Sequence, residues 1–102
     1  MEKINIFDNI KYSKKEEIID ELFSHKKLRV ERILSSGQTS EEWYDQDEEE
    51  FVFLEKGKAE ILYEDGKKVS LKAGDMILIP AHKKHKVSYT SSECVWLCVF
   101  TR

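Results

Sequence analysis

The sequence predicts a single all-β domain, either a sandwich or a barrel. Seven short segments of strand character follow one another at spacings of roughly 8–12 residues, with no helical pattern between them. The four glycines and the single proline mostly fall between apolar segments, where they mark turns. A chain of 102 residues and 12.0 kDa is long enough for one hydrophobic core.

One helix is expected near the N-terminus, over residues 13–24. Ser13 followed by Glu16 matches a capping box, and the apolar residues that follow recur at helical spacing. These apolar residues are Ile18, Ile19, Leu22 and Phe23. We therefore expect residues 1–27 to form an N-terminal segment with an amphipathic helix, and residues 28–102 to form the barrel domain.

The strands are expected where apolar and polar residues alternate or where β-branched and aromatic residues cluster. Asp65 and Gly66 form a two-residue hairpin signal between two of them. The expected strands cover residues 28–36, 51–55, 58–64, 69–71, 76–79, 85–89 and 94–101.

Composition and charge exclude several classes of partner. The net charge of -3 and the pI near 5.6 argue against a nucleic acid or an anionic membrane surface as the partner. No apolar run approaches the ~18 residues that span a bilayer. The first residues lack the apolar core of a secretion signal, so we expect a cytoplasmic protein.

The acidity of the chain is local. Seven of its 20 acidic residues fall within residues 41–50, where no Lys or Arg occurs. The rest of the chain carries 13 acidic residues against 17 basic ones. Such a run is either a solvated loop or a segment in which one or two carboxylates turn inward to bind a cation.

The two cysteines, Cys94 and Cys98, lie on the last expected strand. On a strand they share one face about 13 Å apart, whereas a disulfide tolerates only about 4.4–6.8 Å between Cα atoms. We therefore expect two buried core thiols in a reducing compartment.

The chain resembles the cupin family over roughly residues 28–100. Gly74, Pro80 and His85 have the spacing of the second cupin motif. The one departure within that motif is His82, which occupies the usual glycine position.

The first cupin motif is only partly present. Glu50 and Gly57 have the spacing with which it ends, but the His-x-His pair that the family carries upstream of the glutamate is missing. The residues at those two positions are Tyr44 and Gln46 or, with the longer of two possible gaps, Trp43 and Asp45. We prefer the first pair, because the Gln46 carbonyl can coordinate and an indole cannot.

The resemblance implies a jelly-roll barrel that holds a divalent metal ion, which would be zinc, iron, nickel or manganese. The implied metal ligands are Gln46, Glu50, His85 and His82. Each has an alternative: Gln46 as a hydrogen-bond donor, His85 as an exposed turn residue, Glu50 as a buried hydrogen-bonded carboxylate, and His82 in solvent at the barrel mouth.

Three aromatic residues are candidates for ligand binding, namely Tyr44, Trp43 and Trp96. Trp96 lies on an expected strand and would form core or pocket wall. Tyr44 would aim a phenol at the pocket or pack elsewhere, and Trp43 would line the pocket or form a subunit contact.

Three functions follow from these residues. The first is a metal-dependent enzyme, or a metal-dependent sensor, acting on a small organic molecule. The second is a metal-free module that binds a sugar-like or anionic ligand. The third is a purely structural or oligomeric role, and the resemblance also implies a homodimer. The missing histidines leave a ligand set poorer in nitrogen, which disfavours iron-dependent oxygen chemistry.

Overall fold

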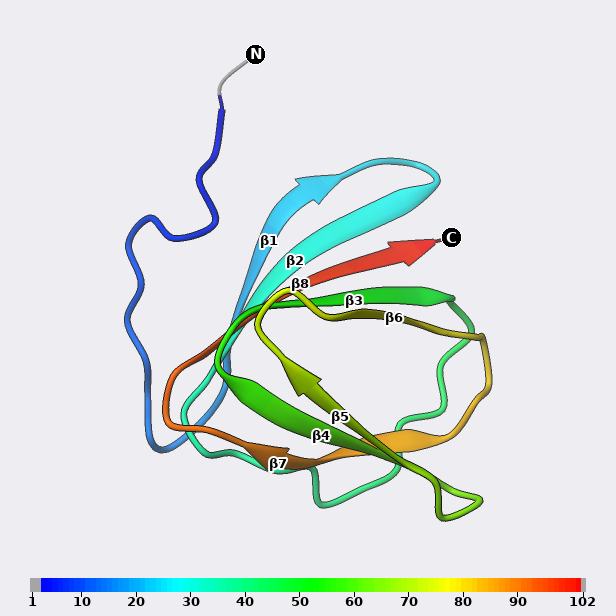
Figure 1. The fold of residues 1–102 in the computed structure, drawn as a ribbon. Coiled ribbons are helices and arrows are strands. Elements are labelled where there is room, and N and C mark those ends of the chain that lie inside the picture. Colours follow the sequence, from blue (N-terminus) through cyan, green and yellow to red (C-terminus); the bar gives the residue numbers. More distant parts are fainter. Residues whose placement is uncertain (1–2, 102) are drawn as a thin grey trace.

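The computed structural model describes residues 3–101, which contain eight β-strands and no helix (Figure 1). The strands are β1 (Ile18–Ser24), β2 (Leu28–Ser35), β3 (Glu50–Lys56), β4 (Lys58–Tyr63), β5 (Lys68–Lys72), β6 (Met76–Ile79), β7 (His85–Thr90) and β8 (Cys94–Thr101). The last seven have nearly the bounds that the sequence predicts. These described residues contain no helix long and apolar enough to cross a membrane.

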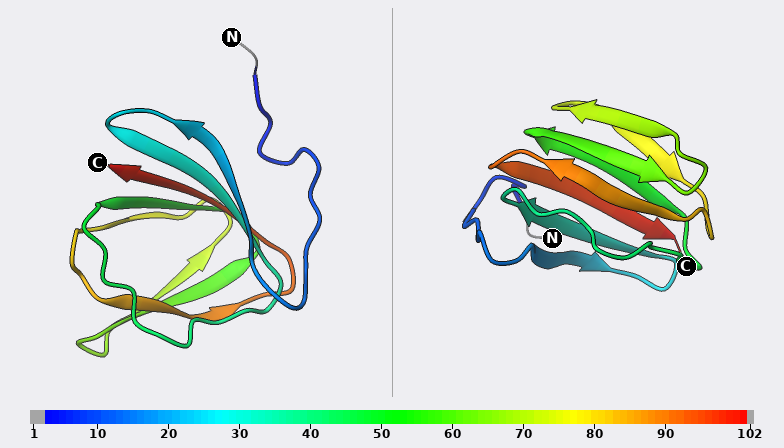
Figure 2. Two further views of the ribbon diagram at one scale, coloured as in Figure 1. Left: turned by 180° about the vertical axis from the view of Figure 1, so that it is seen from behind. Right: turned by 90° about the horizontal axis from the view of Figure 1, so that it is seen from below.

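The strands form two antiparallel sheets. The larger has the order β1-β2-β8-β3-β6 and the smaller the order β5-β4-β7. The two sheets face each other across the interior, as the view from behind shows (Figure 2, left). The prediction of an all-β jelly-roll barrel is therefore confirmed.

The predicted N-terminal helix is wrong. Residues 18–24 form the edge strand β1, which pairs in antiparallel fashion with β2. The Ser13 hydroxyl accepts a hydrogen bond from the Lys15 amide, two residues on, and so closes a local turn instead of capping a helix. Pairing with β2 satisfies the backbone of this segment, and it outweighs the weak helical preference of the sequence.

Residues 3–17 precede β1 and are anchored by Arg32, a buried residue of β2. The Arg32 guanidinium donates to the carbonyl oxygens of Ile6 at 3.0 Å and Asp8 at 2.6 Å. It also pairs with the Asp20 carboxylate of β1 at 2.9 Å. Arg32 therefore ties the N-terminal segment and β1 to the larger sheet.

The hydrophobic core lies between the sheets and follows the alternation of the strands. Val52 and Leu54 of β3, Ile61 of β4 and Trp96 of β8 are all buried and pack in one cluster. Both cysteines are free and buried, as predicted.

Gly57, the glycine of the first motif, joins β3 to β4. Its φ angle is +94°, and a Cβ atom there would lie 2.5 Å from the Glu93 carbonyl oxygen. This turn therefore accepts only glycine without rearrangement.

The connection from β2 to β3 runs along the edge strand β7. The Ser40 amide donates to the Val87 carbonyl, and Tyr44 exchanges two backbone hydrogen bonds with His85. This connection carries Gln46 as well, so it brings two candidate site residues beside the first residue of β7.

Candidate functional site

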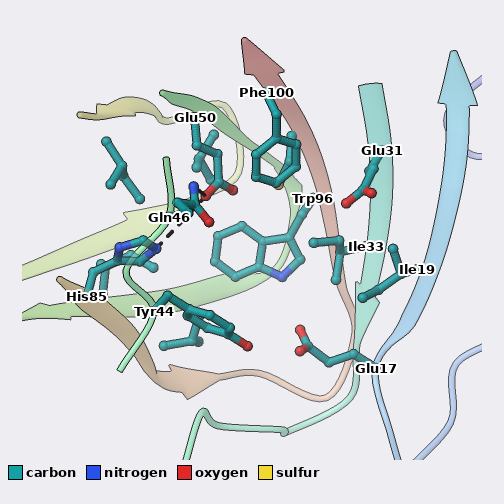
Figure 3. Close-up of a pocket in the computed structure, with 15 residues that line it drawn as sticks. Glu17, Ile19, Glu31, Ile33, Tyr44, Gln46, Glu50, His85, Trp96 and Phe100 are labelled. Carbon is teal, nitrogen blue, oxygen red and sulfur yellow. Dashed lines mark hydrogen bonds and ion pairs between the residues drawn. The ribbon is translucent and has the colours of Figure 1, made fainter. Parts of the chain in front are cut away.

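A cavity of about 180 Å³ lies between the two sheets (Figure 3). Its walls come from β1, β2, β3, β6 and β8 on one side and from β4 and β7 on the other. The β2–β3 connection and Glu17, the residue before β1, complete the lining. Three carboxylates and three aromatic rings are among the lining groups: Glu17, Glu31, Glu50, Tyr44, Trp96 and Phe100.

Glu50 is the first residue of β3 and only 10% of its side chain is exposed. Gln46 Nε2 donates to Glu50 Oε1 at 3.0 Å. Burial raises the pKa of Glu50 above its ordinary value, while the hydrogen bond from Gln46, the Cys98 thiol and the nearby His85 act in the opposite direction. The carboxylate is thus costly to bury, and its neighbours only partly offset that cost.

His85 is the first residue of β7 and is 4% exposed. Its Nδ1–H donates to the Lys83 carbonyl at 2.9 Å, because a carbonyl oxygen can only accept. This leaves Nε2 to face Glu50 Oε1 at 3.9 Å, a separation too long for a hydrogen bond. Residues from two distant stretches of the chain therefore place an imidazole and a carboxylate against the same cavity.

Tyr44 and Trp96 also line this cavity. The Tyr44 ring lies with its centroid 5.6 Å from that of His85, and Tyr44 is half exposed. The Trp96 indole N–H donates to the Ser35 hydroxyl at 3.0 Å, which holds the ring as a buried wall. The structure thus brings Tyr44 and Trp96 together with Gln46, Glu50 and His85.

The remaining two candidates lie elsewhere. His82 does not line the cavity; its side chain is 64% exposed and contacts Asp45 at 2.9 Å and Asp47 at 3.3 Å. Its φ angle of +62° explains why this motif usually has glycine here. Trp43 is 39% exposed and outside the cavity, with the Lys86 ammonium 4.4 Å from its ring centroid.

Several lining residues were missed at the sequence level. Glu31 and Phe100 could have been found from strand alternation, because Phe100 shares a face with Trp96 and Cys98. Glu17 could not, because it precedes the strand that the sequence presents as a helix.

The donor set around Glu50 does not fit a resident divalent metal. A zinc site needs three or four protein ligands, and within residues 3–101 no group of three or more His, Cys, Asp or Glu side chains is arranged to hold one. Gln46 presents its N–H to Glu50 in place of a cation. Burial raises the pKa of Cys98 well above its ordinary value, so this thiol stays protonated in the metal-free protein.

The fold is thus a small eight-stranded antiparallel barrel with a partly open cavity between its two sheets. The chain belongs to the cupin family: the family model described as "Cupin domain" matches residues 30–100.

Solved structures agree with this membership. A protein of Ralstonia eutropha JMP134, provisionally assigned as a mannose-6-phosphate isomerase, is 34% identical with a TM-score of 0.92; the match covers 99% of this chain and 98% of that one. A cupin superfamily protein of Desulfitobacterium hafniense DCB-2 is 17% identical, with a TM-score of 0.79 and coverage of 90% and 83%. An RmlC-like cupin of Desulfovibrio desulfuricans is 12% identical, with a TM-score of 0.81 and coverage of 98% and 96%.

The last two similarities concern the fold alone. A search of curated proteins found no match to this chain.

Proposed function

We propose that this cupin binds a small organic molecule in the barrel cavity without a resident metal ion. One observation carries the proposal: His85 Nε2 and Glu50 Oε1 lie 3.9 Å apart, both side chains are buried, and both border a cavity of about 180 Å³. A buried carboxylate with no full counter-ion destabilises a fold. A ligand group that hydrogen-bonds to both atoms would complete the arrangement.

The metal-dependent enzyme that the family resemblance implies is the less favoured function. It would need more donors than His85 and Glu50 supply, whereas the Gln46 amide already occupies one side of the carboxylate. A phosphorylated sugar is one candidate ligand, because the similar Ralstonia protein is assigned as a mannose-6-phosphate isomerase. This candidate rests on that assignment alone.

A fragment library screened by ligand-detected NMR tests the proposal. Val87 lines the cavity, so Val87→Phe should fill it and abolish fragment binding while the amide spectrum stays dispersed. Val30→Phe, with the same change on β2 outside the cavity lining, is the matched control and should bind like wild type. Equal binding by Val87→Phe, or no binding to wild type, would contradict the proposal.

Elemental analysis of protein purified without chelators tests the metal-free part. We expect far less than stoichiometric zinc, iron, nickel or manganese. Near-stoichiometric metal that disappears in both Glu50→Gln and His85→Ala would show instead that these residues hold a metal.

We also propose that the protein forms a homodimer through the outer face of the larger sheet. Phe51 and Leu78 are cross-strand neighbours on β3 and β6, and both are exposed, as is Met76 beside them. Exposed apolar groups gathered on one face are typical of an interaction surface. Light scattering should show a dimer that Leu78→Lys dissociates, while Tyr89→Lys, an exposed aromatic on β7, leaves it intact. A monomeric wild type would contradict this.

A further inference from the structure

We infer that the cavity selects an organic cation of the amine class over anionic ligands such as phosphate esters. The inference rests on the proposed function, because it assigns a chemical class to the ligand of the same cavity. It follows from the charges of the residues that line the cavity, from the ion pairs of the nearby Arg29, and from the aromatic walls.

The lining is acidic on both sides of the central indole. Glu50 lies on β3, and Glu17 and Glu31 lie on the side of β1 and β2, with Trp96 between them (Figure 3). Among the described residues that line the cavity, none is Lys or Arg, and His85 is the only group that can carry a positive charge. A phosphate ester would therefore enter a cavity without a dedicated cation to receive it.

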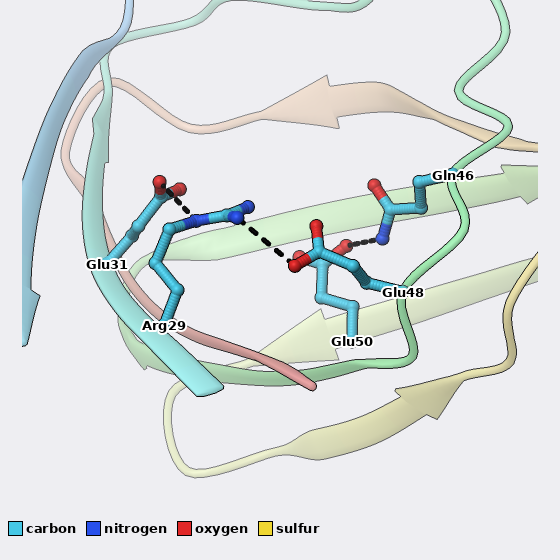
Figure 4. Close-up of polar contacts among 5 residues, drawn as sticks. All are labelled: Arg29, Glu31, Gln46, Glu48 and Glu50. Atoms are coloured by element: carbon cyan, nitrogen blue, oxygen red, sulfur yellow. Dashed lines mark hydrogen bonds and ion pairs between the residues drawn. The ribbon is translucent and has the colours of Figure 1, made fainter. Parts of the chain in front are cut away.

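One guanidinium does reach this region, but it is already paired. Arg29 Nε bonds to the Glu31 carboxylate at 3.0 Å, and Arg29 Nη1 bonds to that of Glu48 at 3.1 Å (Figure 4). The Arg29 Cζ atom also lies 4.3 Å from the ring centroid of Phe100. Two carboxylates thus neutralise one arginine, so the arginine leaves no positive charge for an anionic ligand.

The carboxylates also act on one another. Burial is the largest cause that raises the pKa of Glu50, and the charge of Glu31 raises it further. An ammonium group placed near both would relieve this repulsion, and the burial of Glu50 makes the attraction stronger than it would be in open water.

The remaining walls suit the body of an amine. The rings of Trp96 and Tyr44 face the same cavity, and aromatic faces attract an ammonium group through the ring quadrupole. The geometry therefore offers hydrocarbon and ring surface for the ligand body, and carboxylates for a charged end.

Three probes of similar shape test the inference: benzylamine, which is a cation, benzyl alcohol, which is neutral, and benzoate, which is an anion. Mannose 6-phosphate is added as a phosphate ester. The chain has two tryptophans, so its indole N–H resonances report separately on the cavity wall at Trp96 and on Trp43 outside the cavity. A Trp43→Phe variant assigns them.

We expect benzylamine to shift the Trp96 resonance saturably, to leave Trp43 unmoved, and to bind at least tenfold more tightly than benzoate or mannose 6-phosphate. Glu50→Gln should weaken benzylamine binding at least tenfold. Glu49→Gln removes the same charge one residue away at an exposed position and should bind like wild type.

The two proposals fail in different ways. If benzoate or mannose 6-phosphate shifts Trp96 with equal or higher affinity than benzylamine, the cation assignment is wrong and the cavity remains a ligand site. The same holds if benzylamine binds equally well to Glu50→Gln. If neither these four probes nor the fragment library moves Trp96, both proposals are wrong.

Discussion

Two histidine–carboxylate pairs in this molecule differ in burial: one is exposed to solvent and the other lies against the cavity. His82 and Asp45 are 2.9 Å apart, with side chains 64% and 42% exposed. His85 and Glu50 are 3.9 Å apart, with side chains 5% and 10% exposed. The exposed pair is the closer one, yet solvent screens it, and exposed ion pairs contribute only about 0–1 kcal/mol. Burial, and not a shorter separation, therefore distinguishes the pair that lines the cavity.

The buried pair is also the one that costs stability. Glu50 carries a carboxylate in an environment that disfavours its charge, whereas Asp45 keeps water on one side. Retaining a destabilising group at a cavity is typical of sites that serve function rather than folding.

The two pairs should differ most in the free energy of unfolding that is lost when each imidazole is removed. His85→Ala leaves a hole in the barrel and orphans the Lys83 carbonyl, so it should lower the free energy of unfolding by about 2–3 kcal/mol. His82→Ala should change it by less than about 0.5 kcal/mol. Urea denaturation of both variants measures the difference, and equal losses would contradict the comparison.

Removing the buried charge should raise the free energy of unfolding, whereas removing the buried imidazole lowers it. Glu50→Gln keeps an acceptor for Gln46 and abolishes the desolvated carboxylate, so it should raise the free energy of unfolding by about 1 kcal/mol, or Tm by roughly 4–8 °C. Asp45→Asn should stay within about 0.5 kcal/mol of wild type. A Glu50→Gln variant that is less stable than wild type would show that the carboxylate stabilises the fold.

The pH dependence of stability should follow the pKa of Glu50. Because that pKa is higher in the folded protein than its ordinary value of 4.5, the folded state retains a proton that the unfolded state has released. The contribution of Glu50 to stability is therefore greatest below pH 4.5 and is lost as the pH rises through the folded pKa. The advantage of Glu50→Gln over wild type should widen through that window and then level off.

Urea denaturation of wild type and Glu50→Gln between pH 4 and 8 measures this advantage, with Glu49→Gln as the surface baseline. A gap that narrows as the pH rises would mean that the pKa of Glu50 is lowered in the folded state.

The smallest expected effect concerns the backbone of the exposed pair. His82 adopts a φ angle of +62°, which costs a residue with a Cβ atom more than it costs glycine. His82→Gly should therefore raise the free energy of unfolding by about 0.5 kcal/mol despite losing both aspartate contacts. His82→Ala retains the strain and should show no gain in Tm. A destabilised His82→Gly would mean that the contacts with Asp45 and Asp47 outweigh the strain.

The sequence was sufficient for seven of the eight strands, and five of its seven candidate site residues do line the cavity. Alternation and turn residues determine which segments become β2 to β8, because each strand exposes one face to the core. Motif spacing singled out Glu50 and His85. Each of them is the first residue of a strand, and its side chain points inward.

Tertiary structure decided the rest. The segment at β1 lacks a decisive local preference, so the backbone partners that β2 offers made it a strand. Whether His82 turns inward depended on a loop conformation that strand periodicity does not specify. The charge of the cavity depended on Glu17, which precedes β1, meeting Glu31 of β2 and Glu50 of β3, and on Arg29 being already paired. The order of residues along a strand sets the alternation of its side chains, but only long-range strand pairing determines which charges line the same cavity.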